Sequence, residues 1–259
     1  MSETARRFED LLAEAERRPL VGWDLDYDGR IGFAAPWDFE ALVDAQVRTA
    51  PDLLDMGTGG GEWLSRRPFP KGRTVATEGW APNVAVARGR LGPLGAQVVA
   101  VEGAPDNADQ ARAGQLPRLP FADAAFHLVT NRHESFVAAE VARALAAGGR
   151  FLTQQIRGDF DAPLRALLDL APRPPGPVWD LAEAVRQAQA AGLQVTRSGE
   201  GEARITYADV GALAWYLLNL PWVLPGVAAD AWRGQLAALH GRGALSVAQP
   251  MFWLEARKA

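Results

Sequence analysis

Apolar and polar positions along the chain follow two periods, and the short apolar runs give the clearer signal. Such runs, bounded by glycine, proline or polar residues, are typical of buried strands. Segments with apolar residues three and four positions apart predict amphipathic helices between them. The expected strands are 53–56, 73–78, 97–101, 126–131, 150–154, 193–197 and 251–257. The expected helices are 4–17, 38–49, one beginning near 61, 83–91, 135–145, 179–191 and a helical insert over about 209–240.

The regular alternation of strands and helices predicts an α/β fold class. We expect a doubly wound, seven-stranded, mostly parallel sheet of Rossmann-like type, with N-terminal helices and a helical insert before the last strand. The length of 259 residues allows one large domain or two small ones. We expect effectively one domain, in which residues 51–259 carry the sheet and the insert, and residues 1–50 form a helical lid region.

Composition narrows the class of protein. Hydrophobic residues make up 48% of the chain, enough for a large core, and cysteine is absent, which excludes disulfides, thiolate metal sites and cysteine nucleophiles. The start of the chain lacks the pattern of a signal peptide. The most apolar stretch, 212–229, contains Asn219, Pro221 and Pro225, which argues against a membrane span. We therefore expect a cytoplasmic protein.

A glycine-rich turn carries the most specific chemistry. The pattern is D-x-G-x-G-x-G, formed by Asp55, Gly57, Gly59 and Gly61 directly after an expected strand. Glycines at such a turn allow the backbone to approach a nucleotide-bearing cofactor closely. The dinucleotide fingerprint G-x-G-x-x-G would need a third glycine where Glu62 stands, and a carboxylate there faces the pyrophosphate unfavourably. A nicotinamide oxidoreductase is therefore the last of the alternatives.

The next expected strand ends in Glu78, at the distance beyond the turn where an acid accepts hydrogen bonds from ribose hydroxyls. Trp80 follows two positions later and is placed to pack on an adenine face. The alternative interpretation of this pair is a surface glutamate beside a core tryptophan. The spacing favours the cofactor role.

The glycine motif resembles motif I of the class I S-adenosylmethionine-dependent methyltransferases, whose cofactor is a sulfonium cation without phosphate. The resemblance covers roughly 53–156. Residues 119–129 (LPFADAAFHLV) are similar to the family's approach to its fourth strand, and residues 140–149 (EVARALAAGG) to the segment before its fifth. His127 and Ala147 depart from the usual Asp and Pro. Outside this core, Trp23-Asp24 and the C-terminal region resemble a bacterial subgroup of the family.

The resemblance implies a methyltransferase fold that binds S-adenosyl-L-methionine. Residues 115–118 (Gln-Leu-Pro-Arg) stand where the family commonly has an acidic pair that contacts adenine, so Asn107 and Gln115 are the candidates for that contact. The implied cofactor-binding set is Asp55, Gly57, Thr58, Gly59, Gly61, Glu78, Trp80, Asn107 and Asn131.

The end of the fourth strand should face the transferable methyl group, because ligands of open α/β sheets bind outside the carboxyl ends of the strands. His133 lies there, and its ordinary pKa suits a general base. The alternative for His133 is a histidine at a helix start that bonds Glu134 or the backbone. Arg132 is a further candidate, as a residue that holds an anionic substrate.

The predicted function is transfer of a methyl group to an O or N atom of a small molecule. The net charge of −4 disfavours a nucleic-acid surface, so an RNA methyltransferase is the second hypothesis. A SAM-binding protein without methylation is the third. Residues 24–31 match half of a calcium loop, but Ala35 occupies the position of the bidentate Glu, so no metal is expected. The sequence predicts neither the acceptor nor the oligomeric state.

Overall fold

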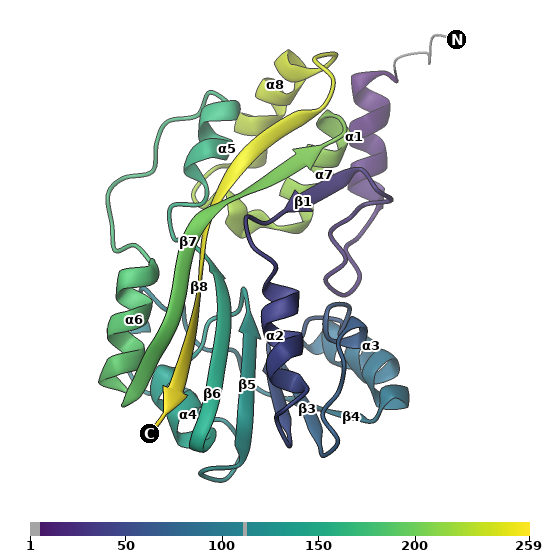
Figure 1. Ribbon diagram of the computed structural model, residues 1–259. Coiled ribbons are helices and arrows are strands. Elements are labelled where there is room, and N and C mark those ends of the chain that lie inside the picture. The colour runs from purple at the N-terminus through teal and green to yellow at the C-terminus, as the bar shows by residue number, and fades with distance from the viewer. Residues whose placement is uncertain (1–5, 111–112) are drawn as a thin grey trace.

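The computed structural model describes residues 6–110 and 113–259 (Figure 1). The strands are β1 (Ile31–Ala34), β2 (Leu53–Met56), β3 (Thr74–Glu78), β4 (Ala96–Ala100), β5 (Phe126–Arg132), β6 (Leu145–Ile156), β7 (Leu193–Tyr207) and β8 (Leu245–Lys258). The α-helices are α1 (Phe8–Arg17), α2 (Phe39–Val47), α3 (Ala81–Leu91), α4 (Ala138–Ala144), α5 (Ala162–Leu167), α6 (Leu181–Ala190), α7 (Val210–Asn219) and α8 (Ala229–Leu239). Short 3₁₀ helices are η1 (Leu64–Arg66), η2 (Gly92–Leu94) and η4 (Pro221–Val223).

The strands form one mixed sheet in the order β1-β7-β8-β6-β5-β2-β3-β4. The pairs that join β4, β3, β2, β5 and β6 are parallel, whereas β8 is antiparallel to both β6 and β7. From β2 the chain first builds outward through β3 and β4, and then returns to the other side of β2 with β5. This reversal creates a topological switch point, where open α/β sheets bind their ligands.

Both faces of the parallel strands are buried. Adjacent residues of a strand point to opposite faces, so each face has its own core. On one face Leu54, Val129 and Phe151 belong to a core shared with α4 and α6. On the other face Leu53 and Leu128 pack with α2 and α3. These short, continuous apolar runs are what strands covered on both faces require.

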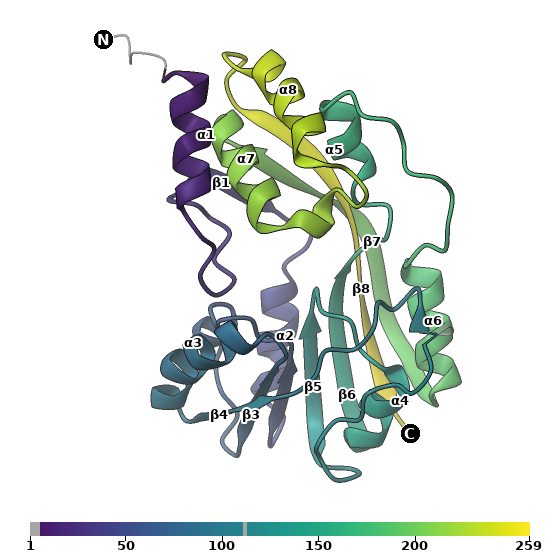
Figure 2. The same cartoon turned by 180° about the vertical axis from the view of Figure 1, so that it is seen from behind.

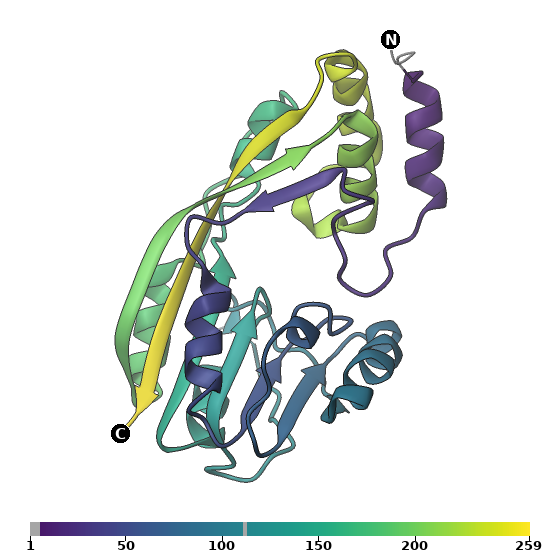
Figure 3. The ribbon, with the colours of Figure 1, turned by 45° about the vertical axis from the view of Figure 1, so that its right-hand side comes forward.

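The β7–β8 pair continues beyond the parallel strands (Figure 3). The last residue of β6, Ile156, pairs with Met251 of β8, and β7 and β8 stay paired from there to Tyr207 and Leu245. Along this extension β1 pairs with β7 in antiparallel register, from Ile31 opposite Tyr207 onward. The extension is therefore a three-stranded ribbon outside the carboxyl ends of the parallel strands.

A third core lies on this ribbon. We call α1, β1, α5, α7, η4 and α8, with the adjoining ends of β7 and β8, the cap. Its buried residues include Leu11 of α1, Leu213 of α7 and Leu236 of α8, which contact one hydrophobic cluster. The N-cap Asp209 accepts a hydrogen bond from the Ala212 backbone amide and fixes the start of α7. Figures 1 and 2 show the cap beyond the parallel strands, with the N-terminal segment and the insert side by side.

The structure corrects several details of the expected fold. The sheet has eight strands instead of seven, because the N-terminal region contributes β1 as well as helices. It is mixed because β8 is antiparallel to β6 and β7, and β1 is antiparallel to β7. The two C-terminal strands are longer than expected, since they also build the cap. The helix expected near 61 is only the short η1, and α5 was not predicted. The expected helix 4–17 is seen as α1, and its first two residues lie outside the described ranges.

Candidate functional site

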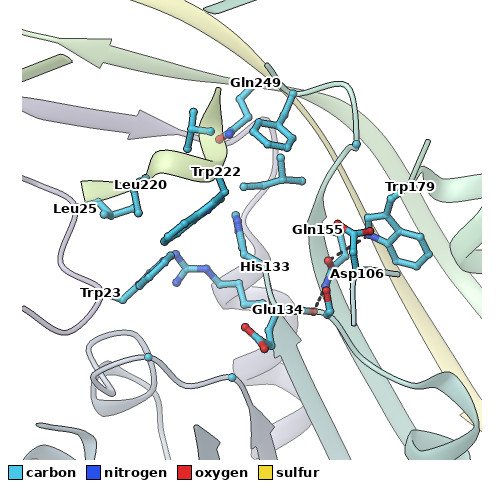
Figure 4. A pocket seen from close by; sticks show the side chains of 18 of the residues that line it. Trp23, Leu25, Asp106, His133, Glu134, Gln155, Trp179, Leu220, Trp222 and Gln249 are labelled. Carbon is cyan, nitrogen blue, oxygen red and sulfur yellow. Dashed lines mark hydrogen bonds between the residues drawn. The ribbon is translucent and has the colours of Figure 1, made fainter. Parts of the chain in front are cut away.

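A cavity of about 1750 Å³ lies between the cap and the carboxyl ends of β2, β3 and β5. Its floor contains the glycine turn after β2 and the residues that follow β3 and β5. Its cap side is formed by the loop after α1, by β1, by α7 with η4, and by β7 and β8. Figure 4 shows side chains from these segments pointing toward one another. The sequence analysis expects a ligand outside the carboxyl ends of the strands, which is the side of the sheet where this cavity lies.

The glycine turn disfavours larger residues, through its backbone conformation and through close side-chain contacts. Gly57, Gly59 and Gly61 have φ values of 69°, 63° and 80°, a region that side chains rarely adopt. A Cβ on Gly57 would lie 2.4 Å from the Cβ and Cγ atoms of Glu134, and one on Gly59 would lie 2.8 Å from the Cβ atom of Trp23. Gly57 and Gly59 face the cavity. The backbone there is open to a ligand as the motif predicts.

Asp55 lies at the bottom of the cavity and is 3% exposed. Its Oδ1 accepts a hydrogen bond of 2.8 Å from the Thr130 hydroxyl. Burial raises the pKa of Asp55 to about 6, although the Thr130 and Thr58 hydroxyls and the Arg132 charge act against that rise. Thr58 also lines the cavity. Asp55 is thus a desolvated carboxylate with too little positive charge around it.

Glu78 and Trp80 stand beside each other at the end of β3. The Glu78 Oε1 accepts the Trp80 backbone amide at 2.8 Å, and this contact holds the carboxylate at the cavity wall. Burial raises the pKa of Glu78, against hydrogen bonds from the backbone of Trp80, Gly59 and Gly79. The Trp80 side chain is 52% exposed and also lines the cavity. An exposed indole at this position offers a stacking face.

Glu134 is a third carboxylate of the site and was not among the predicted site residues. It follows β5, lines the cavity and packs on Gly57. Burial raises the pKa of Glu134 to about 7, and the negative charge of Glu78 adds to the rise. Three carboxylates, from Asp55, Glu78 and Glu134, therefore crowd one partly desolvated space. Such a space favours a cationic ligand.

Arg132 is the last residue of β5 and also lines the cavity. Within the described residues its guanidinium makes no hydrogen bond or ion pair, and its closest ring contact is with Trp63, 5.6 Å from the centroid. Burial lowers the pKa of Arg132, and the nearby charges of Arg66 and Arg67 add to this effect. Asp55 and Glu40 act in the opposite direction. Arg132 is thus a cation without a direct partner in the described chain, beside the acidic cluster.

His133 follows Arg132 and lines the cavity, with φ of 63°. Its Nε2 lies 2.8 Å from Nε2 of Gln154, whose Oε1 accepts the Trp37 indole N–H at 2.7 Å. The His133 ring also contacts Phe33 edge-on at 6.4 Å. Burial and the Arg132 charge lower the pKa of His133 well below its ordinary value. His133 is therefore a neutral imidazole, and its contact with Gln154 fixes its orientation.

The remaining predicted residues lie farther from the open part of the site. The Asn107 carboxamide bonds both backbone groups of Phe136, at 2.8 and 3.2 Å, although Asn107 also lines the cavity. Asn131 is fully buried in the sheet, where its Oδ1 accepts the Thr153 hydroxyl at 2.9 Å. Gln115 is exposed on the segment before β5 and lies outside the cavity wall. Their contacts with adenine or cofactor stay predictions.

The comparisons with known proteins bear on the fold. The sequence matches no protein-family model and no curated protein. The structure is similar to YcgJ of Bacillus subtilis, with 18% identity, 85% of this chain and 97% of that chain covered, and a TM-score of 0.57. It is also similar to a candidate methyltransferase of Bacillus halodurans C-125, with 17% identity, coverage of 85% and 97%, and a TM-score of 0.53.

A protein of unknown function from Deinococcus radiodurans R1 is a third similar structure, with 15% identity, coverage of 88% and 91%, and a TM-score of 0.51. These likenesses support the coarser part of the expected fold, an α/β Rossmann-like sheet with flanking helices. In the described part of the chain, no helix has the length and apolar character needed to cross a membrane.

Proposed function

We propose that this protein is an S-adenosylmethionine-dependent methyltransferase that methylates an O or N atom of a small molecule. The observation that carries the proposal is the cluster of Asp55, Glu78 and Glu134 around the open glycine turn. S-adenosylmethionine has a sulfonium and an ammonium group, and both gain from nearby carboxylates. A dinucleotide brings a pyrophosphate, which these carboxylates repel.

The residues present fit this cofactor in distinct roles. Glu78 accepts the ribose hydroxyls, and Trp80 offers its indole to the adenine. Asp55 and Glu134 balance the positive charge, while Arg132 pairs with the carboxylate of the amino acid end. When bound, the cofactor supplies a methyl group activated on sulfur. The chain's own task is then to hold the acceptor in line and keep water out.

His133 contacts the acceptor in this proposal. Its Nε2 already accepts a hydrogen bond from Gln154, so the nitrogen that remains, Nδ1, carries a proton. That geometry supports a hydrogen-bond donor better than the general base expected from the sequence. A donor at this position orients the acceptor for in-line transfer.

The experiment that tests the function is calorimetric titration with S-adenosylmethionine, S-adenosylhomocysteine and NAD. We expect binding of both sulfur compounds and none of NAD. Asp55→Asn removes one buried charge and weakens binding, whereas Asp230→Asn on the exposed start of α8 leaves it unchanged. Binding of NAD, or equal affinities in the two variants, would overturn the proposal. A labelled methyl donor then allows acceptors to be screened.

A further inference from the structure

The cap half of the cavity differs from its floor in character. The floor is lined by the acidic cluster. The helices and strands of the cap contribute mainly apolar side chains, whereas the charged lining residues of the cap side, Asp24, Asp26, Asp159, Asp161 and Arg173, belong to its loops and to the segments beside α5. The lining residues of α7 and η4 carry no charge, and those of β1 and β7 are likewise apolar. Two indoles stack beside this chamber, Trp23 of the N-terminal loop and Trp222 of η4, with centroids 6.1 Å apart and planes 8° from parallel. Figure 4 shows both at the cavity.

Among the polar side chains of this chamber, one comes from β8. Gln249 of β8 is 6% exposed, and in the described chain its carboxamide has no hydrogen-bond partner. Figure 4 shows the Gln249 amide pointing from the sheet into the cavity, with His133 beyond it. By contrast, Asn219 of the same chamber is fully engaged, because it accepts the Leu20 amide at 2.7 Å and donates to the Trp215 carbonyl at 2.9 Å.

The Gln249 carboxamide is not among the buried polar atoms that lack a partner, so its donor and acceptor are accessible from the cavity. A ligand with a hydroxyl or carbonyl group can hydrogen-bond this amide in place of water.

The strand register gives the length of the chamber. His133 contacts Gln154, which pairs with Trp253 of β8, and Gln249 lies four residues farther along that strand. At roughly 3.3 Å per strand residue, the level of Gln249 is about 13 Å from the level of His133. A molecule that reaches from one to the other is therefore elongated, and the apolar walls cover its middle.

We propose that the cap half of the cavity is the acceptor subsite, and that it binds an elongated, uncharged, largely apolar molecule whose far end hydrogen-bonds to Gln249. The near end of this molecule lies beside His133, and its middle passes the Trp23–Trp222 stack. The name acceptor subsite rests on the proposed methyltransferase function. The binding of such a molecule does not, because it depends only on the walls and on Gln249.

The test uses two naphthalene probes, one neutral and one anionic. The neutral ketone prodan is titrated into the protein in the presence of S-adenosylhomocysteine, and its emission is followed. We expect one bound equivalent with blue-shifted emission. Anionic anilinonaphthalene sulfonate should bind far more weakly, because carboxylates outnumber cations among the residues that line the cavity. Tight binding of the anion together with no binding of prodan would overturn the proposal.

Variants assign the binding to the chamber. Gln249→Leu keeps the size of the side chain but removes the hydrogen bond, and it should weaken prodan binding about fivefold or more. The matched control is Gln189→Leu on the exposed face of α6, which should leave the affinity unchanged. Leu218→Trp fills the chamber without altering the amide and should abolish binding. Equal affinities in the wild type and these chamber variants would contradict the assignment.

A parallel titration with S-adenosylhomocysteine alone separates the two proposals. Loss of the cofactor result counts against the methyltransferase function and leaves the Gln249 test intact. Cofactor binding without prodan binding rejects the acceptor subsite only.

Discussion

Gln154 places its Nε2 2.8 Å from Nε2 of His133, and this contact determines which ring nitrogen carries the proton. The Trp37 indole can only donate, so the Gln154 Oε1, at 2.7 Å, must be the acceptor. The amide nitrogen of Gln154 then faces His133 and donates to it. His133 is consequently the Nδ1–H tautomer, with its free donor on the opposite side of the ring.

The first prediction concerns this tautomer. The chain has three histidines, so ¹⁵N-histidine labelling resolves each of them by NMR. We expect His133 to show the neutral Nδ1–H pattern and to stay neutral as the pH falls through its ordinary pKa of 6.5, because burial lowers its pKa. Since the unfolded chain takes up a proton there and the folded chain does not, His133 reduces stability as the pH falls below about 6.5.

Trp37→Phe tests the cause. Without the indole donor the Gln154 amide is free to rotate, and the Nε2–H tautomer of His133 should become populated. Trp222→Phe changes an indole that does not touch Gln154 and should leave the tautomer unaltered. A His133 that protonates near pH 6.5 in the wild type would contradict the assignment.

The second prediction is that cofactor affinity rises with pH. In the free protein Asp55 has a pKa of about 6 and Glu134 of about 7, so both are partly protonated in slightly acidic solution. A cationic ligand favours the ionised carboxylates and therefore releases protons on binding. Affinity for S-adenosylmethionine should increase from about pH 5.5 to 8, and calorimetry in buffers of different ionisation enthalpy should detect the released protons. A pH-independent affinity would argue against carboxylate contacts.

The third prediction is that Glu134→Gln stabilises the free protein. A carboxyl group whose folded pKa lies above its unfolded value binds a proton more tightly when folded, so stability falls as the pH rises between the two values. Removing the charge should raise the free energy of unfolding at pH 7 by about 1–3 kcal/mol. Urea unfolding at pH 5 and pH 7 measures this gain, which should shrink at the lower pH. Calorimetry should show weaker cofactor binding in the same variant.

The fourth prediction separates backbone strain from contact at the glycine turn. Gly57 and Gly95 both have positive φ, at 69° and 89°, but only Gly57 has a side chain within reach of an added Cβ. Gly95→Ala should therefore cost about 1–2 kcal/mol of stability through strain alone. Gly57→Ala should cost more, because Glu134 must move, and it should abolish cofactor binding. If Gly57→Ala and Gly95→Ala lose the same free energy of unfolding, the Glu134 side chain accommodates the added methyl group without cost.

The fifth prediction concerns the unpaired guanidinium. Arg132→Met keeps the length of the side chain and removes a charge that no described residue neutralises by direct contact. We expect unchanged or higher stability, because an unpaired buried charge is costly. Affinity for S-adenosylhomocysteine should fall, whereas that for methylthioadenosine, which lacks the amino acid end, should not. Parallel losses for both ligands would place Arg132 elsewhere than at the carboxylate.

Local signals in the sequence predicted the parallel half of the fold well. The strands predicted at 53–56 and 73–78 are present as β2 and β3, two short buried segments bounded by turn residues, and both end at the cavity floor. The cap was harder to predict, because β1 is four residues long and exists through pairing with β7, more than 170 residues away in the chain. Long-range pairing leaves little trace in local periodicity.

The same reason explains the missed site residues. Gln249 is an ordinary polar residue of a strand in the sequence, and only the path of β8 past the end of β6 brings it to the cavity. The His133 tautomer depends on Trp37 and Gln154, which are 117 positions apart. Glu134 could have been predicted from the sequence, because it adjoins His133 at the end of β5. An acid at that position indicates a ligand contact as well as a histidine does.

The unbroken course of β7 and β8 has a mechanical consequence. The two strands belong to the sheet at one end and to the cap at the other, and they stay paired along the 14 residues of β8. A rigid-body movement of the cap away from the sheet would have to bend this paired ribbon. We expect ligands to enter and leave past the segments that border the cavity outside the paired strands. These segments are the loop between α1 and β1 and the proline-rich stretch 172–177. The cap is therefore joined to the sheet by continuous strands, and access to the cavity depends on the loops at its sides.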